Sequence, residues 1–339
     1  MTVMEARLRP RTVLAMAPGV REEVFAKGAL DRLAELADLH GDVLHDLSSG
    51  SALPVLAEAE VLVTGWGCPP LGAELLERAP KLRFIAHAAG TVKTFLDPVV
   101  LEGGVRVSSA ADANAVPVAE FTYAAIVFGA KRAFTMAHRY REHGTKRDFS
   151  GISWLGARRI TVGVVGFSRI GRRVVELLRG LEAEVLVYDP YADPALVARL
   201  GGVLVDLDTL VRRSHVVSLH APSTPETYRL LDRSRLAKLM DGAVVINTAR
   251  GTLIDTEALL EEVTSGRLDA ILDVSDPEPL PSGHPLFGLP NVFLTPHLAG
   301  AQGNELGRLA DSTVEEVARY CAGLPLLHEI QLDALDRMA

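Results

Sequence analysis

The stretch that decides the fold reads Ile160-Thr-Val-Gly-Val-Val-Gly-Phe-Ser-Arg-Ile-Gly171, and Val185-Leu-Val-Tyr-Asp189 follows it after an amphipathic segment. A short apolar run before closely spaced glycines predicts a strand, a tight turn and a helix, and the second apolar run predicts the next strand. Gly166 and Gly171 occupy the first and third glycine positions of the G-x-G-x-x-G pattern. An acid at Asp189 accepts hydrogen bonds from a ribose and repels a 2′-phosphate, so this unit predicts NAD rather than NADP.

Ser168 stands where this pattern has its middle glycine. Glycine there lets the backbone approach a pyrophosphate closely, whereas serine adds a small side chain whose hydroxyl can bond a phosphate oxygen. The alternative interpretation is a β-α-β unit that binds no nucleotide. The agreement of strand, helix, second strand and acid favours the nucleotide site.

Short apolar runs alternate with amphipathic stretches along the whole chain, which predicts parallel α/β architecture. Expected strands in the first part are Thr12–Met16, Val43–Leu47, Val61–Thr64, Phe84–His87 and Val105–Val107, with helices at Arg21–Leu39 and Leu71–Arg78. A long apolar helix with Pro117 in its first turn should extend to about His138, before a mixed excursion at Arg139–Gly156. The second part predicts strands Ile160–Val165, Glu184–Tyr188, Val216–Leu219, Ala243–Ile246, Ala270–Leu272 and Val292–Leu294, and helices Arg169–Gly180, Leu207–Arg213, Asp232–Leu239, Asp255–Ser265 and Gln302–Cys321.

Composition narrows the class of protein. The 339 residues suit two domains, and the 48% of hydrophobic residues can form a sizeable core. A net charge of −8 argues against a sequence-independent hold on nucleic acid or an anionic membrane surface. The two cysteines are far apart, so no metal site or disulfide framework is predicted. With no apolar run of signal-peptide or membrane-span length, we expect a cytoplasmic protein.

Three titratable residues lie at or just beyond predicted strand ends: Arg250, Glu278 and His297. Taken singly, Arg250 could cap a turn, Glu278 could lie in a solvated loop, and His297 could be a core residue. In doubly wound sheets, however, the carboxyl ends of the strands form the ligand crevice, so the three side chains could converge there. Together they suit hydride chemistry on a carbonyl: a cation binds a carboxylate, a histidine exchanges the hydroxyl proton, and a carboxylate orients the histidine.

At these residues the sequence resembles the D-isomer-specific 2-hydroxyacid dehydrogenase family. The resemblance is most specific at Val217–Pro222, Asn247–Gly251, Leu272–Val274 with Asp276–Pro279, and Thr295–His297. It implies that Arg250 binds substrate, that Glu278 is the partner of the histidine, and that His297 is the general acid/base. It further implies a small 2-hydroxy or 2-keto acid as substrate. The implied cofactor contacts are Thr91, Gly166, Ser168, Arg169, Ile170, Gly171, Asp189, Ala221, Thr248, Ala249, Arg250, Asp273, His297 and Gly300, with Asp273 bonding the nicotinamide carboxamide.

The resemblance also implies two doubly wound parallel-sheet domains. A flavodoxin-like substrate domain would comprise 1–116 and 302–339, with a Rossmann NAD-binding domain, 117–301, inserted into it. Amides of the loop at Ala89 and Gly90 would meet the substrate carboxylate, together with Arg250 and His297. The helix after Pro117 and the following excursion would form a homodimer contact.

Departures from the family bear on the substrate. The loop reads Gly90-Thr-Val-Lys-Thr94 and lacks the second glycine and the acid of the common form. Ala88 stands where phosphoglycerate enzymes usually carry arginine, so a phosphorylated substrate is not favoured. Trp66 follows a predicted strand and His87 ends one, and each could either contact the substrate or pack in the core. His220 also ends a strand, where it could form a pocket wall or have a chemical role. Trp154 is expected to be a packing or interface anchor.

The sequence is also compatible with two other functions. One is an NAD-sensing binding protein without significant turnover, similar to the C-terminal-binding-protein corepressors. The other is a dehydrogenase of a different acid, such as formate. The substrate side chain and the physiological direction are not determined by the sequence.

Overall fold

A computed structural model describes residues 9–144 and 149–337 of the chain. The chain forms two compact units, each with its own sheet. Unit 1 takes the chain up to Asn114 and again from Ala301, and unit 2 takes Ala115–Gly300. These limits lie within two residues of the boundaries expected from the sequence, at 116/117 and 301/302.

Unit 2 contains a seven-stranded parallel sheet in the order β12-β11-β10-β9-β6-β7-β8. The strand order reverses between β6 and β9, which gives the strand order of a Rossmann fold with one added strand; sheets of this kind bind ligands at the carboxyl ends of the strands beside the reversal. The strands are β6 Thr161–Val165, β7 Glu184–Tyr188, β8 Val203–Leu204, β9 Val216–Leu219, β10 Val244–Asn247, β11 Asp269–Leu272 and β12 Val292–Leu294.

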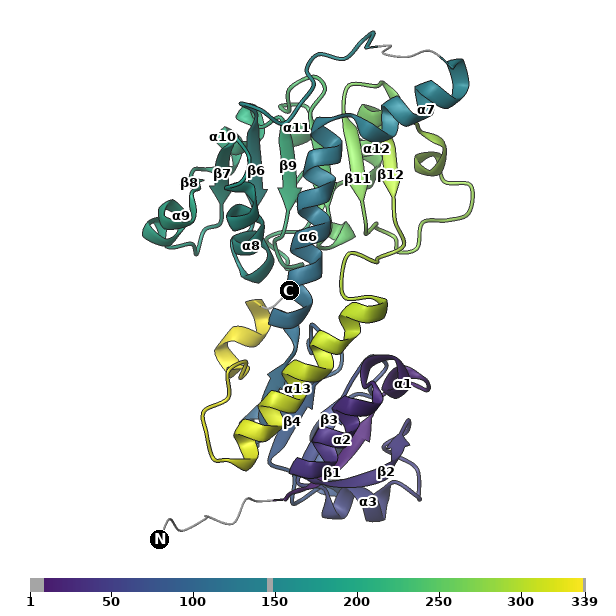
Figure 1. Ribbon diagram of the computed structural model, residues 1–339, viewed down its shortest axis with the longest axis vertical. Coiled ribbons are helices and arrows are strands. Elements are labelled where there is room, and N and C mark those ends of the chain that lie inside the picture. The colour runs from purple at the N-terminus through teal and green to yellow at the C-terminus, as the bar shows by residue number, and fades with distance from the viewer. Residues whose placement is uncertain (1–8, 145–148, 338–339) are drawn as a thin grey trace. The chain divides into compact units, whose positions relative to one another are not determined.

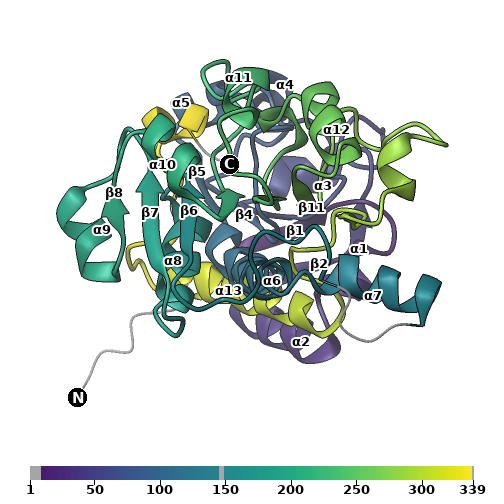
Figure 2. The ribbon, with the colours of Figure 1, turned by 90° about the horizontal axis from the view of Figure 1, so that it is seen from above.

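Helices cover both faces of this sheet (Figures 1 and 2). One face packs against α6 Ala111–Ala130, α8 Arg169–Leu178 and α9 Pro194–Leu200, and the other against α10 Leu207–Arg213, α11 Arg233–Leu236 and α12 Thr256–Thr264. Burial of both faces explains why the strands are near-continuous Val, Leu and Ile. Gly163 in β6 allows α10 to pack closely, because a Cβ there would stand 2.4 Å from Leu210 Cδ2.

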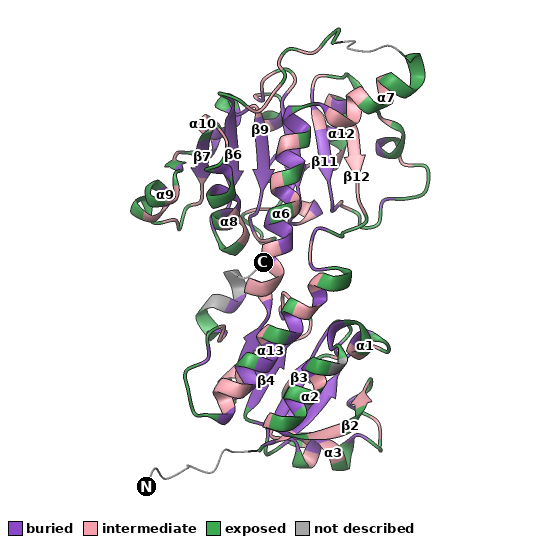
Figure 3. Ribbon diagram, in the orientation of Figure 1, coloured by how far each residue is buried: buried purple, intermediate pink, exposed green. Residues whose placement is uncertain are grey.

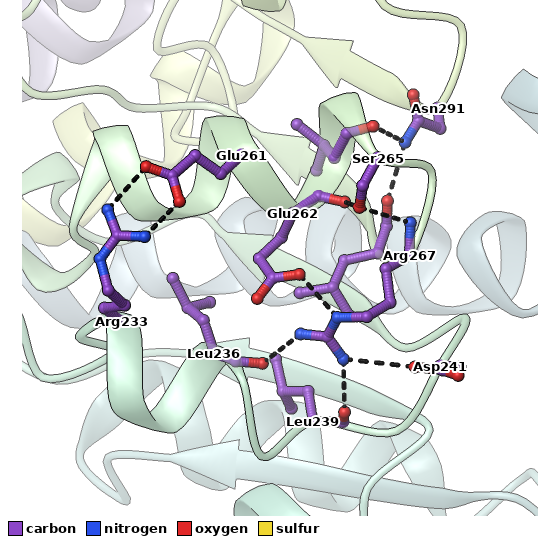
Figure 4. A network of polar contacts seen from close by, with 11 residues as sticks. Arg233, Leu236, Leu239, Asp241, Glu261, Glu262, Ser265, Arg267 and Asn291 are labelled. Atoms are coloured by element: carbon purple, nitrogen blue, oxygen red, sulfur yellow. Dashed lines mark hydrogen bonds and ion pairs between the residues drawn. The ribbon is translucent and has the colours of Figure 1, made fainter.

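A polar network fixes the layer of α11 and α12 (Figure 4). Arg267 donates to the carbonyls of Leu239 and Leu236 at 2.7 and 2.6 Å, and its Nε forms an ion pair with Glu262 at 2.6 Å. Asn291 donates to the carbonyls of Val263 and Leu268, both at 2.8 Å. These side chains satisfy carbonyls near helix ends and between elements that would otherwise lack partners.

Unit 1 contains a five-stranded parallel sheet in the order β2-β1-β3-β4-β5, the flavodoxin-like order. Its central strands are buried, whereas β2 at the edge is partly exposed (Figure 3). The strands are β1 Arg11–Ala15, β2 Asp38–Leu44, β3 Val61–Thr64, β4 Phe84–His87 and β5 Arg106–Ser109. One face packs against α1 Val20–Val24, α2 Lys27–Leu36 and α13 Leu306–Cys321, and the other against α3 Leu53–Glu58, α4 Ala73–Arg78 and α5 Pro98–Glu102.

Several elements differ from the sequence-based prediction. The expected helix Arg21–Leu39 is two helices, and the chain enters β2 at Asp38, before the strand expected at Val43. β8 and α9 were not predicted. The helix expected to begin near Pro117 begins at Ala111, with Pro117 inside it, and it ends at Ala130. Part of the expected excursion is helix α7, Ala133–His143.

Helix α6 is long and apolar enough to cross a membrane by length and composition. The sequence predicted a long apolar helix here but did not mark it as a candidate membrane span. Half of its most apolar window is buried, and Ala125, Ile126 and Ala130 pack on the sheet with Val162 and Val244. This packing is that of a core helix of unit 2.

Two buried histidines make the stability of the fold depend on pH. Burial lowers the pKa of His87 in unit 1 and of His220 in unit 2 to about 3 in each case. In the unfolded chain a histidine has a pKa near 6.5, so protons bind preferentially to the unfolded state below that pH, and stability falls as pH decreases. Between pH 7.5 and pH 5 we expect a loss of about 2 kcal/mol of unfolding free energy per buried histidine.

Urea unfolding of the wild type and of His220→Asn at several pH values measures this effect. The variant should lose stability less steeply between pH 7.5 and 5, whatever its stability at pH 7.5. Equal pH slopes in the two proteins would show that His220 does not stay neutral in the folded state.

Candidate active site

The turn after β6 fits a dinucleotide. Gly166 has φ 94°, and a Cβ there would stand 2.6 Å from Ala221 N, so the turn packs directly on the end of β9. A Cβ on Gly171 would stand 2.0 Å from the Gly166 carbonyl oxygen. Glycine is therefore required at both positions, and the turn leads directly into α8, whose N-terminus attracts a phosphate.

Ser168 is the N-cap residue of α8, and its hydroxyl makes no capping bond with that helix. The helix then begins with Arg169 and Ile170. The serine at this position therefore does not serve as a side-chain cap of the helix.

Asp189 directly follows β7 and accepts hydrogen bonds from backbone N–H groups on both sides. Its Oδ2 accepts a hydrogen bond from Phe167 N at 2.7 Å, and its Oδ1 accepts one from Tyr191 N at 2.8 Å. Each carboxylate oxygen retains a further lone pair, so both can also accept a ribose hydroxyl. The Asp189 carboxylate is thus hydrogen-bonded directly to the backbone of the glycine turn.

The next strand ends carry the other expected cofactor residues of unit 2. Thr248 follows β10, and its hydroxyl is hydrogen-bonded to that of Thr122 in α6 at 2.8 Å. Asn247 fixes the same turn: its Oδ1 accepts from Ala249 N at 3.1 Å, and its Nδ2 donates to the Arg250 carbonyl at 2.8 Å. Neither Thr122 nor Asn247 was singled out from the sequence.

Asp273, which directly follows β11, is 2% exposed. Its Oδ1 accepts hydrogen bonds from Thr295 Oγ1 at 2.6 Å and from Leu298 N at 2.8 Å, and its Oδ2 accepts one from Ala299 N at 2.9 Å. The backbone N–H of His297 donates to the Asp273 carbonyl at 2.9 Å. The residue expected to bond a carboxamide therefore also holds the loop that carries His297 and extends to Gly300.

The structure brings His297 and Glu278 together. His297 Nδ1 lies 2.6 Å from Glu278 Oε1, and both side chains are partly exposed. His297 has φ 53°, an uncommon conformation for a residue other than glycine, which is held by the bonds that Asp273 makes around it. Because Nδ1 faces the carboxylate, Nε2 is left to face a substrate.

Arg250 lies on the loop after β10, near enough to Glu278 for their two charges to interact. Burial lowers its pKa, and the nearby Glu278 carboxylate opposes that shift by raising the pKa. The loops of Arg250 and Glu278 approach closely because Gly251 lies against the Ser275 peptide; a Cβ on Gly251 would stand 2.0 Å from Ser275 C and O. The guanidinium stays charged and can bind an anion.

The expected substrate residues of unit 1 follow β4. Ala89 is buried, Gly90 is partly exposed, and Thr91 Oγ1 accepts a hydrogen bond from Lys93 N at 3.3 Å. Val92, at the position of the missing second glycine, is 1% exposed and belongs to the core.

Four further residues weighed from the sequence have clear places. His87 is 2% exposed, its Nδ1 lies 2.9 Å from Thr64 Oγ1, and its ring packs on Phe95, so it is a core residue. His220 is also 2% exposed, which leaves it no surface as a pocket wall. Trp154 packs under the Arg132 guanidinium at 4.4 Å and is a packing anchor. Trp66 is 39% exposed and remains a candidate for substrate contact.

Comparison with known proteins gives the same indication as the geometry of the site. Residues 124–299 match the family model described as D-isomer specific 2-hydroxyacid dehydrogenase, NAD binding domain. The chain is 32% identical over 276 residues to the hydroxypyruvate reductase of Thermotoga maritima, which covers 80% of this chain and 88% of that protein. The chain belongs to the D-isomer-specific 2-hydroxyacid dehydrogenase family.

Other members of this family extend the comparison. The D-3-phosphoglycerate dehydrogenase of Mycobacterium tuberculosis is 36% identical over 273 residues, or 80% of this chain and 51% of that protein. The chain thus spans about half the length of the phosphoglycerate dehydrogenases that it matches. The D-lactate dehydrogenase of Aquifex aeolicus, solved with NAD and lactic acid, superposes with a TM-score of 0.70 at 28% identity, covering 92% of this chain and 96% of that one. Unit 2 thus contains the NAD-binding domain of this family.

Replacing Asp189 with alanine tests the ribose assignment. Loss of a charged acceptor should weaken NADH binding roughly 10- to 100-fold. The same change removes the bonds to Phe167 N and Tyr191 N, which weakens the turn for any dinucleotide. The ratio of the NADPH to the NADH dissociation constant, measured by fluorescence titration, separates the two effects: it should fall in Asp189→Ala. An unchanged ratio would limit Asp189 to a role in the turn.

Proposed function

We propose that the protein is an NAD-dependent oxidoreductase that interconverts a D-2-hydroxy acid and its 2-keto acid. The observation that carries the proposal is the 2.6 Å contact of His297 Nδ1 with Glu278 Oε1, beside the Arg250 cation and on the sheet that carries the glycine turn. A histidine backed by a carboxylate, next to a carboxylate-binding cation, is the set that this reaction needs.

In the direction of reduction, NADH supplies the hydride that C2 of the keto acid accepts. Arg250 binds the substrate carboxylate and draws electron density from the adjacent carbonyl. His297 donates the proton on Nε2 to the carbonyl oxygen, and Glu278 stabilises the cationic imidazolium before that transfer. In the direction of oxidation, His297 takes the hydroxyl proton on the same nitrogen. The amides of Ala89 and Gly90 are proposed to bind the substrate carboxylate from unit 1.

The substrate proposed is an unphosphorylated 2-keto acid. Ala88 and Ala89 are buried apolar residues, and burial keeps the pKa of the neighbouring His87 at about 3, so this imidazole carries no charge for a phosphate. Trp66 is the exposed aromatic side chain after β3 in this unit. We infer that it contacts the substrate side chain.

Stereospecificity tests the reaction type. The protein should reduce NAD with the D form of a 2-hydroxy acid, and the L form should give no more than the rate explained by its content of D isomer. Equal rates with both enantiomers, or production of carbon dioxide from formate at the higher rate, would contradict the proposal. NADH production followed by absorbance, with chiral analysis of the remaining acid, decides the point.

We also propose that the protein is a homodimer. Helix α7 has no buried residue in this chain, and nearby aromatic residues Phe128, Tyr140 and Phe149 are 51%, 55% and 45% exposed. A second copy that covers this surface would remove these side chains from water. Sedimentation equilibrium would give the mass of one chain if the proposal is wrong.

A further inference from the structure

The chain passes between the two units twice, and both crossings leave unit 1 at the same place. The first lies within α6, between Asn114 and Ala115, and the second lies between Gly300 and Ala301. Asn114 Oδ1 accepts a hydrogen bond from the backbone N–H of Ala301 at 2.9 Å, although the two residues are 187 positions apart in the sequence. One carboxamide therefore joins the two crossings.

The same carboxamide lies beside the loop after β4. Asn114 Nδ2 is 3.5 Å from the position that a Cβ on Gly90 would take. This proximity follows from the sheet: β4 pairs with β5 with His87 opposite Ser109, and Ala110 N donates to the His87 carbonyl at 2.9 Å. The first turns of α6 are consequently held next to the loop that contains Ala89 and Gly90.

Backbone groups on either side of the Asn114–Ala301 hydrogen bond have few alternative partners. Pro117 lies inside α6 and has no N–H, so the Ala113 carbonyl, one residue before Asn114, loses its helical partner. Ala301 is 1% exposed, and a buried N–H that loses its acceptor is costly. Directly after Ala301, the N–H of Gln302 donates to Glu305 Oε2 at 3.0 Å, which starts the segment that leads into α13.

We propose that Asn114 is a positioning residue for the dehydrogenase reaction. Its carboxamide holds the two crossings together beside Gly90 and thereby fixes the position of the loop at Ala89 and Gly90 within unit 1. The proposal rests on the proposed function, because it assumes that this loop binds the substrate carboxylate.

Two substitutions separate this role from direct contact with the substrate. Asn114→Leu keeps the size of the side chain and removes the acceptor, whereas Asn114→Asp keeps an oxygen that can accept from Ala301 N. If Asn114 acts through Ala301, Asn114→Asp should retain most of the activity. If its amide instead binds the substrate carboxylate, Asn114→Asp should be worse than Asn114→Leu, because two carboxylates repel each other.

Steady-state kinetics and NADH titration give the first readout. In Asn114→Leu we expect kcat/KM for the 2-keto acid to fall at least 10-fold, mainly through KM. The dissociation constant of NADH should stay within 2-fold, because the glycine turn and Asp189 lie in unit 2. Asn114→Asp should recover kcat/KM to within about 3-fold of the wild type. A wild-type KM in Asn114→Leu, or a lower kcat/KM in Asn114→Asp than in Asn114→Leu, overturns the proposal.

Hydrogen exchange at the Ala301 amide gives a readout that does not depend on turnover. The amide should exchange at least 10-fold faster in Asn114→Leu than in the wild type, and Asn114→Asp should restore its protection. Asn114→Ala, which only removes atoms, is the second test of the same bond if the leucine variant does not fold. If the wild type turns over no 2-keto acid, the proposed function is wrong. Unchanged exchange at the Ala301 amide in these variants would overturn the proposed role of the Asn114–Ala301 hydrogen bond independently of turnover.

Discussion

Replacing His297 with alanine is expected to lower kcat for 2-keto acid reduction by roughly 10²- to 10⁴-fold, the usual contribution of general acid catalysis. The NADH dissociation constant should change little, because the glycine turn and Asp189 do not depend on the imidazole. The structure supports this separation: His297 is on the loop after β12, where Asp273 holds the backbone of its neighbours without using the imidazole. Stopped-flow turnover and fluorescence titration measure the two quantities.

Glu278→Gln tests whether the two side chains act as a pair. The amide keeps the size of the side chain but cannot stabilise an imidazolium as a carboxylate does. The single variant should lose activity, and adding it to His297→Ala should cost almost nothing more, because the interaction is already absent. His40→Ala, in the edge strand β2 of unit 1, is the control and should keep wild-type kcat. Additive losses in the double variant would contradict the pairing.

Replacing Gly251 with alanine should damage both stability and catalysis. The added Cβ would stand 2.0 Å from Ser275 C and O and 2.6 Å from Asp276 N, all of which are backbone atoms that cannot rotate away. We expect a loss of about 1–3 kcal/mol of unfolding free energy from this overpacking. The loops of Arg250 and Glu278 must also move apart, and a displacement near 1 Å at such a site costs roughly 10²-fold in rate.

Gly288→Ala is the matched control for this change. Gly288 lies in the same unit, nothing stands within 4 Å of a Cβ there, and its φ is not in the left-handed region. It should keep wild-type stability and kcat/KM. If Gly251→Ala kept wild-type kcat/KM as well, the close approach of the two loops would not be what places Arg250 beside Glu278.

The fold of unit 2 could be predicted from the sequence because its sheet is covered on both faces. Strands such as β9 and β10 are buried along their whole length and are therefore mostly apolar, which marks them in the sequence. β8 has only two residues, and neither is buried, so it left no such signal. The break between α1 and α2 was missed because apolar residues continue across it and Ala26, the N-cap of α2, makes no side-chain cap.

The chemically distinctive residues of the site could also be found from the sequence. Gly166, Gly171 and Asp189 are recognised by spacing, and Arg250, Glu278 and His297 by their places after strands. Pro117 misled the prediction of a helix start, because proline is usual in a first turn but lies here in the seventh position of α6.

The contacts that hold the site could not be found in this way. Thr122 meets Thr248 across 126 residues, Asn114 meets Ala301 across 187, and Asp273 binds Ala299 across 26. Each is a common residue type whose partner is chosen by the folded sheet, so no local pattern marks it. Asp273 was expected to face the cofactor, and its three bonds to the His297 loop emerged only from the structure.

Dehydrogenase activity is tested most directly by NADH consumption by the wild-type protein across a panel of unphosphorylated 2-keto acids, with NADPH and with 3-phosphohydroxypyruvate as comparisons. We expect turnover of at least one unphosphorylated acid to its D-2-hydroxy product, with NADH preferred over NADPH. Saturable NADH binding with no turnover of any acid in the panel would contradict it, and would identify the protein as a nicotinamide-nucleotide-binding member of the family without dehydrogenase activity.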